Sequence, residues 1–123
     1  VANVNSAPTP TAWMKQPIRS SWLTDPLILD SAFQMMILWS FEQQGIGSLP
    51  TAIAHYRQYS RCYPKDGAKV IADVIEHTNH RANASIEFVD NKGTLIALME
   101  GYECVRDSSL ELAFKENALS IED

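Results

Sequence analysis

One segment of this 123-residue sequence has apolar side chains around almost the whole circumference of an expected helix. Residues 25–44 read DPLILDSAFQMMILWSFEQQ. Asp25 (or Thr24) can cap the first helical turn, and Pro26 suits the first helical position because its missing N–H needs no partner there. Gly45 can end the helix. A helix with this pattern is buried on most of its sides. We therefore expect a central helix of roughly 18 residues, about 27 Å long.

The sequence after this helix predicts strands. The segments YPKDG and DNKG are typical of turns, and the segments around them alternate or are rich in β-branched residues. The four expected strands are 51–59, 70–77, 84–89 and 94–105. An antiparallel sheet of this kind needs one covered face, and the helix is the element that can cover it. The expected fold class is therefore α+β: a hotdog fold, in which a curved antiparallel β-sheet wraps a long central helix.

The ends of the chain differ in character from its middle. Residues 1–16 contain prolines and small polar residues and predict a linker-like segment. Apolar side chains at Trp13, Met14 and Ile18 could pin the second half of residues 1–20 to a core. We expect the hotdog domain to span residues 17–106, and residues 107–123 to form a tail or a short helix.

Composition excludes several classes of protein. The net charge of −5 and the lack of a Lys/Arg-rich run argue against a nucleic-acid partner. The two cysteines, Cys62 and Cys104, show no CxxC spacing and suit a reduced compartment, although one disulfide stays open. We expect no membrane span, no secretory signal and a cytoplasmic location. Because the sequence begins at Val1 rather than Met, we expect a piece of a larger protein.

Asp30 and Gln34 are the candidate site residues on the expected helix. They are four residues apart, so they lie one above the other on the same helical face. An acid enclosed by apolar side chains could hold its proton near neutral pH and donate it to a leaving hydroxyl. The nearby helix N-terminus opposes this, because its dipole favours the anion. The alternative is an acid that faces solvent, with Gln34 as its hydrogen-bond partner.

The segment DPLILDSAFQ resembles the second-half motif of polyketide synthase dehydratase domains, in which an Asp-x-x-x-Gln or Asp-x-x-x-His pair follows a leucine-rich segment. The segment SLPTAI resembles the Leu-Pro segment that starts the next strand in that family. The helix pattern is also similar to that of the bacterial β-hydroxyacyl carrier-protein dehydratases of fatty-acid synthesis. This resemblance implies a double hotdog fold that removes water from a β-hydroxyacyl chain on acyl carrier protein. Asp30 would then assist departure of the β-hydroxyl, with Gln34 as its partner.

The resemblance also implies what this chain lacks. The family's base is a histidine of the first hotdog, in a His-x-x-x-Gly-x-x-x-x-Pro motif that is absent here. The nearest frame begins at His55, but Tyr59 stands in place of the glycine, and we attribute it to coincidence. The chain would thus be the second, C-terminal hotdog, completed by an N-terminal hotdog half. Alone it would be inactive, and whether it is an enzyme by itself stays open.

The remaining partners follow from the same resemblance. The substrate would be carried on the phosphopantetheine of acyl carrier protein, and no other cofactor or metal is expected. Two copies could pair through exposed strand edges, so a homodimer is expected. Arg57 and Arg61 could touch the carrier protein or a phosphate. His77 and His80 are expected to be surface residues rather than a metal pair. Side chains that could line an acyl tunnel beside the acid are Phe33, Met35, Met36 and Leu38.

Two other functions remain open from the sequence. The first is a hotdog acyl-thioester hydrolase, in which a helix carboxylate activates water and the homodimer is the complete enzyme. The second is a non-catalytic hotdog that acts as a scaffold or carrier-protein docking element in an assembly line. Hydrolysis of a thioester by the isolated chain would favour the first, and absence of turnover even with a histidine-bearing partner would favour the second.

Overall fold

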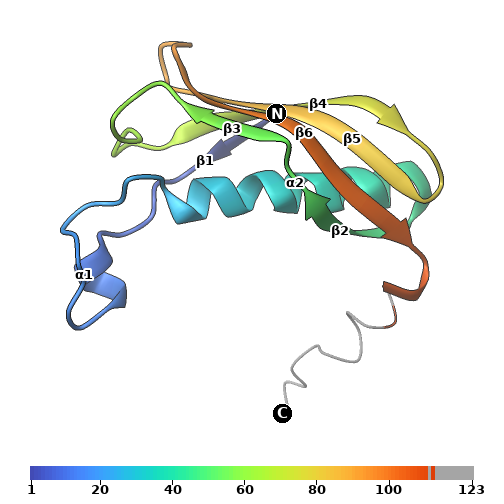
Figure 1. The fold of residues 1–123 in the computed structure, drawn as a ribbon, viewed down its shortest axis with the longest axis horizontal. Coiled ribbons are helices and arrows are strands. Elements are labelled where there is room, and N and C mark those ends of the chain that lie inside the picture. The colour runs from blue at the N-terminus through green and yellow to red at the C-terminus, as the bar shows by residue number, and fades with distance from the viewer. Residues whose placement is uncertain (111, 113–123) are drawn as a thin grey trace.

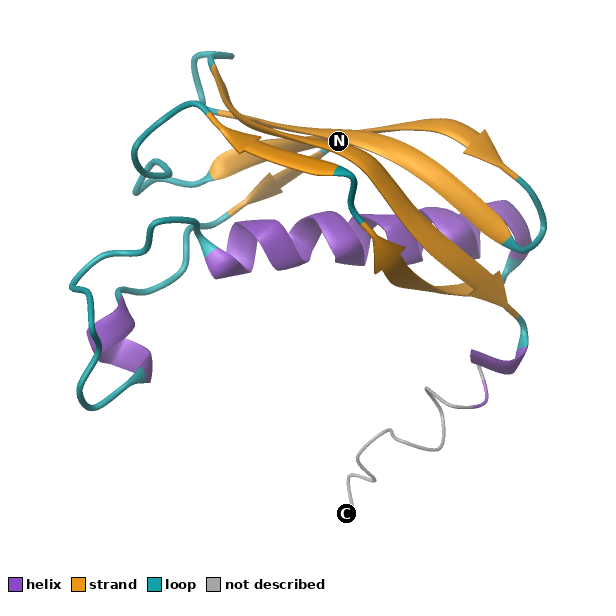
Figure 2. Cartoon of the chain, in the orientation of Figure 1, coloured by secondary structure: helices purple, strands orange, loops and turns teal. Residues whose placement is uncertain are grey.

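The computed structural model describes residues 1–110 and 112 of the chain. Its elements combine one long helix, one short helix and strands of a single sheet (Figures 1 and 2). In chain order they are β1 (Ala2–Val4), α1 (Pro10–Trp13), α2 (Pro26–Gln44), β2 (Gly47–Ala52), β3 (His55–Gln58), β4 (Ala68–His77), β5 (Arg81–Val89) and β6 (Leu95–Asp107).

All strand pairs of the sheet are antiparallel, and the sheet curls over α2. The strand order is β1-β4-β5-β6-β2, and β3 also pairs with β6. Figure 2 shows the sheet arching over one side of the long helix. Three consecutive long strands joined by tight turns form the centre of this arch, because β4, β5 and β6 follow one another both in sequence and in the sheet. The expected hotdog fold is confirmed.

The ends of α2 are those that the sequence predicts. The Asp25 side chain accepts hydrogen bonds from the backbone N–H groups of Leu27 and Ile28, both at 3.0 Å, so it is the N-cap. At the other end Gly45 has a φ of 66°, and its N–H donates to the carbonyl of Phe41 at 2.7 Å. A left-handed residue at this point favours glycine, because it has no Cβ to clash with the backbone.

One face of α2 is fully buried by the sheet. Its buried residues recur every fourth position, namely Ile28, Ala32, Met36 and Ser40. They meet inward-facing side chains of β5 and β6, among them Ile86, Phe88, Met99 and Tyr102. Leu29, Phe33, Met35 and Trp39 are partly buried against the same core, so α2 is covered on most of its sides. The cover fails along one row, at Leu27, Asp30, Gln34 and Leu38, because the sheet is a single layer and does not close around the helix.

The first expected strand, residues 51–59, is two strands in the structure. β2 begins earlier, at Gly47, and pairs with the end of β6, whereas β3 pairs with the middle of β6. The break coincides with Gly101 of β6, which has a φ of 64°. A Cβ at Gly101 would lie 2.5 Å from the Cβ of Ala54. The close approach therefore requires glycine at this bend.

The N-terminal segment is not wholly a linker. Residues 2–4 form β1 and pair with residues 68–70 of β4, so the expectation of a linker over residues 1–16 fails at its start. Gly67, just before β4, lies so close to the backbone of Val4 that a Cβ there would clash with the Val4 carbonyl. Of the expected tail, residues 111 and 113–123 lie outside the described residues.

Candidate functional site

The N-cap of α2 fixes where the candidate acid lies. Besides capping the helix, Asp25 accepts a hydrogen bond from the backbone N–H of Ala7 at 2.8 Å, and its side chain is buried. This contact ties the segment after β1 to the start of α2. Asp25 thus fixes the first turn of α2 through the Leu27 and Ile28 N–H groups and anchors it to Ala7. Asp30 follows in the second turn.

Asp30 and Gln34 form the pair that their spacing predicts. The Gln34 Nε2 donates a hydrogen bond to the Asp30 Oδ2 at 3.2 Å. Both side chains are exposed, on the face of α2 that lies opposite the buried row of Ile28, Ala32 and Met36. The expectation that Asp30 is enclosed by the curled sheet is therefore wrong for this chain, since the sheet covers the other face of the helix.

The two polar residues stand among apolar ones on this open side. We call the side chains of Leu27, Asp30, Gln34, Leu38 and their neighbours the outer face of α2. Leu27, in the first turn of α2, is 38% exposed, and Leu38, in its second half, is 65% exposed. A helix face with exposed leucines on both sides of a hydrogen-bonded acid is typical of a surface that another protein layer or a ligand covers.

The four residues expected to line an acyl tunnel do not share one face of the helix. Met36 is fully buried against the sheet, whereas Leu38 points to solvent on the outer face. Phe33 stacks on Tyr102 of β6 with ring centroids 5.8 Å apart, and Met35 packs partly buried against the core. The helical positions of these residues spread around the axis, and their part in an acyl tunnel stays a prediction.

The histidines lie on β3, at the end of β4 and in the turn between β4 and β5. His55, His77 and His80 are exposed, as the sequence predicts for His77 and His80. The ring of His77 packs edge-on against the ring of Trp39, with ring centroids 5.2 Å apart. In the part of the chain that the structure describes, no group of three or more His, Cys, Asp or Glu side chains could hold a metal ion.

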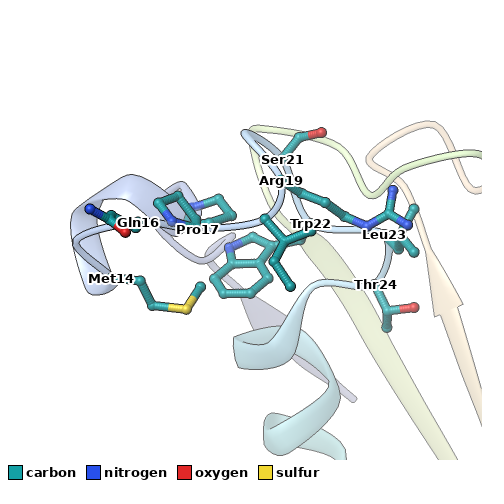
Figure 3. Close-up of a pocket in the computed structure, with 10 residues that line it drawn as sticks. Met14, Gln16, Pro17, Arg19, Ser21, Trp22, Leu23 and Thr24 are labelled. Carbon is teal, nitrogen blue, oxygen red and sulfur yellow. The ribbon is translucent and has the colours of Figure 1, made fainter.

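A large pocket lies in the segment that joins α1 to α2, for which the sequence analysis predicted no site (Figure 3). Its volume is about 640 Å³, within the range of small-molecule sites. Apolar side chains dominate its lining, including Met14, Pro17, Ile18, Trp22 and Leu23.

Trp13, Met14 and Ile18 were expected to pin the second half of residues 1–20 to a core, but Trp13 is 51% exposed, Met14 is 44% exposed and Ile18 is fully exposed. The segment is held instead by polar contacts and by the packing of Trp13 on Trp22, with ring centroids 5.6 Å apart. The Trp22 Nε1 donates to the carbonyl of Pro8 at 2.7 Å, and the Thr24 hydroxyl donates to Gln58 Oε1 at 2.8 Å. The apolar surface of the pocket is therefore left open beside the helix end that carries Asp30.

Comparison with known families decides the assignment. The model of the polyketide synthase dehydratase N-terminal domain matches residues 2–113, which is most of the chain. The chain belongs to the polyketide synthase dehydratase family. The match includes β1, in agreement with the pairing of residues 2–4 in the sheet. No curated protein and no solved structure matches.

Membership of this dehydratase family supports the hotdog fold and acyl carrier protein as the general partner. The description of the matching family names the N-terminal domain, whereas the Asp-x-x-x-Gln pair predicts the second hotdog. Which half of the dehydratase this chain forms, and the roles of Asp30 and Gln34, stay predictions. Among the described residues, no helix combines the length and the hydropathy needed to cross a membrane.

Proposed function

We propose that this chain is the second hotdog of a dehydratase domain in a polyketide or fatty-acid synthase. It would eliminate water from a β-hydroxyacyl chain on acyl carrier protein and give the enoyl product. The observation that carries this proposal is the Asp30–Gln34 hydrogen bond on the outer face of α2, in a chain that belongs to the dehydratase family.

The outer face explains why the site needs a second hotdog. Leu27 and Leu38 would lose their exposed apolar surface if another hotdog packed on this side, at a gain of about 25 cal/mol for each Å² removed from water. The same packing would exclude bulk water from Asp30 and from a substrate bound beside it. The enclosure that the sheet of this chain does not supply would thus come from the first hotdog.

In this mechanism each half contributes one group. A histidine of the first hotdog takes the α-proton, because this chain has no His-x-x-x-Gly-x-x-x-x-Pro motif. Asp30 donates a proton to the leaving β-hydroxyl, and the water departs as the α,β double bond forms. Gln34 holds the Asp30 carboxyl through its amide N–H and orients the acid toward the substrate. A positioned acid of this type contributes about 10² to 10⁴ in rate.

The decisive experiment uses the chain with its natural upstream segment and a β-hydroxyacyl carrier protein. Mass spectrometry should show the loss of one water, and Asp30→Asn should abolish it. Gln34→Ala should lower the rate with a smaller effect. Asp73→Asn is the matched control, since Asp73 is an exposed aspartate on β4, away from the outer face of α2, and should leave the rate unchanged. Full activity of Asp30→Asn would remove this carboxyl from the mechanism.

A second copy of this chain could also cover the outer face of α2. The homodimeric thioester hydrolase is therefore the second candidate function. In that case the isolated chain would be a dimer and would hydrolyse an acyl thioester without any upstream segment. Sedimentation of the isolated chain, together with a thiol-release assay, separates this outcome from the dehydratase. Hydrolysis that Asp30→Asn abolishes would favour the hydrolase over the proposed elimination.

A further inference from the structure

The most unusual charged residue of the fold is Arg106, near the end of β6. Its side chain is only 1% exposed, whereas Arg81 on the neighbouring strand is exposed and pairs with Glu103 at 3.1 Å. Among residues 1–110 and 112, no carboxylate lies within ion-pairing distance of Arg106. A buried cation without an opposite charge is costly, since it has lost water without gaining a counter-ion.

Only some of the N–H donors of the Arg106 guanidinium have hydrogen-bond partners in the protein. Its Nε donates to the Ser40 hydroxyl at 2.9 Å, and its Nη1 donates to the carbonyl of Thr78 at 2.9 Å. The guanidinium carbon lies 4.9 Å from the ring centre of Trp39. The Nη2 is buried and has no hydrogen-bond partner among the described residues. Both N–H groups of Nη2 are thus left unused, out of the five that a guanidinium carries.

Arg106 also lines a pocket of about 320 Å³ between the end of α2 and the β4–β5 turn. The polar side chains around it include Gln44, Asn79, His80 and Ser108, which can all donate hydrogen bonds. The one acid in the lining is Asp107. Its carboxylate already accepts a hydrogen bond from the backbone N–H of Ser109 at 2.9 Å, and this bond lowers the pKa of Asp107.

We propose that this pocket, defined by Arg106, Asn79, His80 and Ser108, binds an oxyanion, either a phosphoryl group or a carboxylate. The anion would lie beside Arg106 and offset its positive charge, and it would accept hydrogen bonds from the polar side chains that line the pocket. Nη2 itself is closed off from solvent. The site lies at the opposite end of α2 from Asp30 and is independent of the proposed dehydration.

The test is thermal unfolding in inorganic phosphate or acetate, with sodium chloride matched for ionic strength. A ligand that binds the folded state alone raises the melting temperature in a saturable way. We expect this rise with phosphate, together with a shift of the Arg106 Nε–H signal in nitrogen-15 spectra. A rise with phosphate alone identifies a phosphoryl site, and a comparable rise with acetate identifies a general carboxylate and phosphate site.

Two kinds of variant keep the test sharp. Arg106→Met removes the charge and should abolish the rise, but it also changes the core. Asn79→Asp is milder, because it retains the oxygen that accepts from Gln44 Nε2 at 2.8 Å and adds a negative charge at the pocket. It should weaken phosphate binding about tenfold or more. Asn5→Asp makes the same change at another exposed position and should bind as the wild type does. No rise with either anion, or equal binding by Asn79→Asp, overturns the proposal.

Discussion

Gln34 donates a hydrogen bond to Asp30 across one turn of α2, on the side of the helix that the sheet does not cover. The pair is therefore formed without help from the core of its own domain. A hydrogen bond between exposed side chains adds little to folding stability, because water competes for both partners. The arrangement thus costs the fold little and leaves an acid on an open surface, where a second protein layer can complete a site.

This position predicts a separation of stability from activity at Asp30. Asp30→Asn should change the free energy of unfolding of the isolated chain by no more than about 0.5 kcal/mol, since its side chain is exposed. The same variant should lose activity in the complete dehydratase. Urea unfolding followed by circular dichroism measures the first quantity. A loss of several kcal/mol would mean that Asp30 has a structural role instead.

Asp25 should behave in the opposite way, although it is five residues away on the same chain segment. Asp25→Ala removes the N-cap of α2 and the acceptor for the Ala7 N–H. Loss of an N-cap costs about 1–2 kcal/mol, and the buried donors left behind add to this. Urea unfolding of Asp25→Ala beside Asp30→Ala makes the comparison, since both remove one carboxylate. Equal stability of the two variants would contradict the capping role.

Gly67 should be intolerant of a side chain for a reason that Gly93 does not share. Both have a positive φ, at 93° and 84°, so alanine strains the backbone at each position. At Gly67, however, the added Cβ would also clash with the Val4 carbonyl, whereas at Gly93 it meets no atom within 4 Å.

Gly67→Ala should therefore displace β1 from β4, and Gly93→Ala should not. Hydrogen exchange of the backbone amides of residues 2–4 and 68–70 measures this displacement. If these amides exchange as slowly in Gly67→Ala as in the wild type, β1 tolerates the change.

Stability should fall at alkaline pH because buried groups of the core resist losing their protons. Burial raises the pKa of Tyr63, of Tyr102 and of the Cys104 thiol above their ordinary values. The hydrogen bond between the Tyr56 and Tyr63 hydroxyls raises the pKa of Tyr63 further. With the folded-state pKa above the unfolded one, the unfolded chain loses its protons first as pH rises. Full stability is thus expected below about pH 8, with a progressive loss above it.

Tyr102→Phe tests this pH dependence. The Tyr102 hydroxyl is buried and has no hydrogen-bond partner among the described residues, so its removal should leave stability at pH 7 unchanged or slightly raised. The variant should also lose less stability than the wild type between pH 8 and pH 11, measured by urea unfolding at each pH. An unchanged slope with pH would exclude Tyr102 as a contributor.

Local signals account for the elements that were predicted well. Asp25 and Pro26 mark the start of α2 and Gly45 its end because capping depends on backbone groups within a few residues. The central strands follow from alternation and turn residues in the same way. The sequence did not reveal the split between β2 and β3, because it arises from the contact of Gly101 with Ala54, far away along the chain.

The sequence by itself determined the long helix, the strands that follow it and the stacking of Asp30 and Gln34 on one helical face. Only the tertiary structure decided which face the sheet covers, and it covers the row of Ile28, Ala32 and Met36 rather than the acid. It also decided that Arg106 is buried without a counter-charge. The physical reason is that spacing along a helix fixes which side chains are neighbours, whereas burial depends on strands that meet the helix from distant parts of the chain.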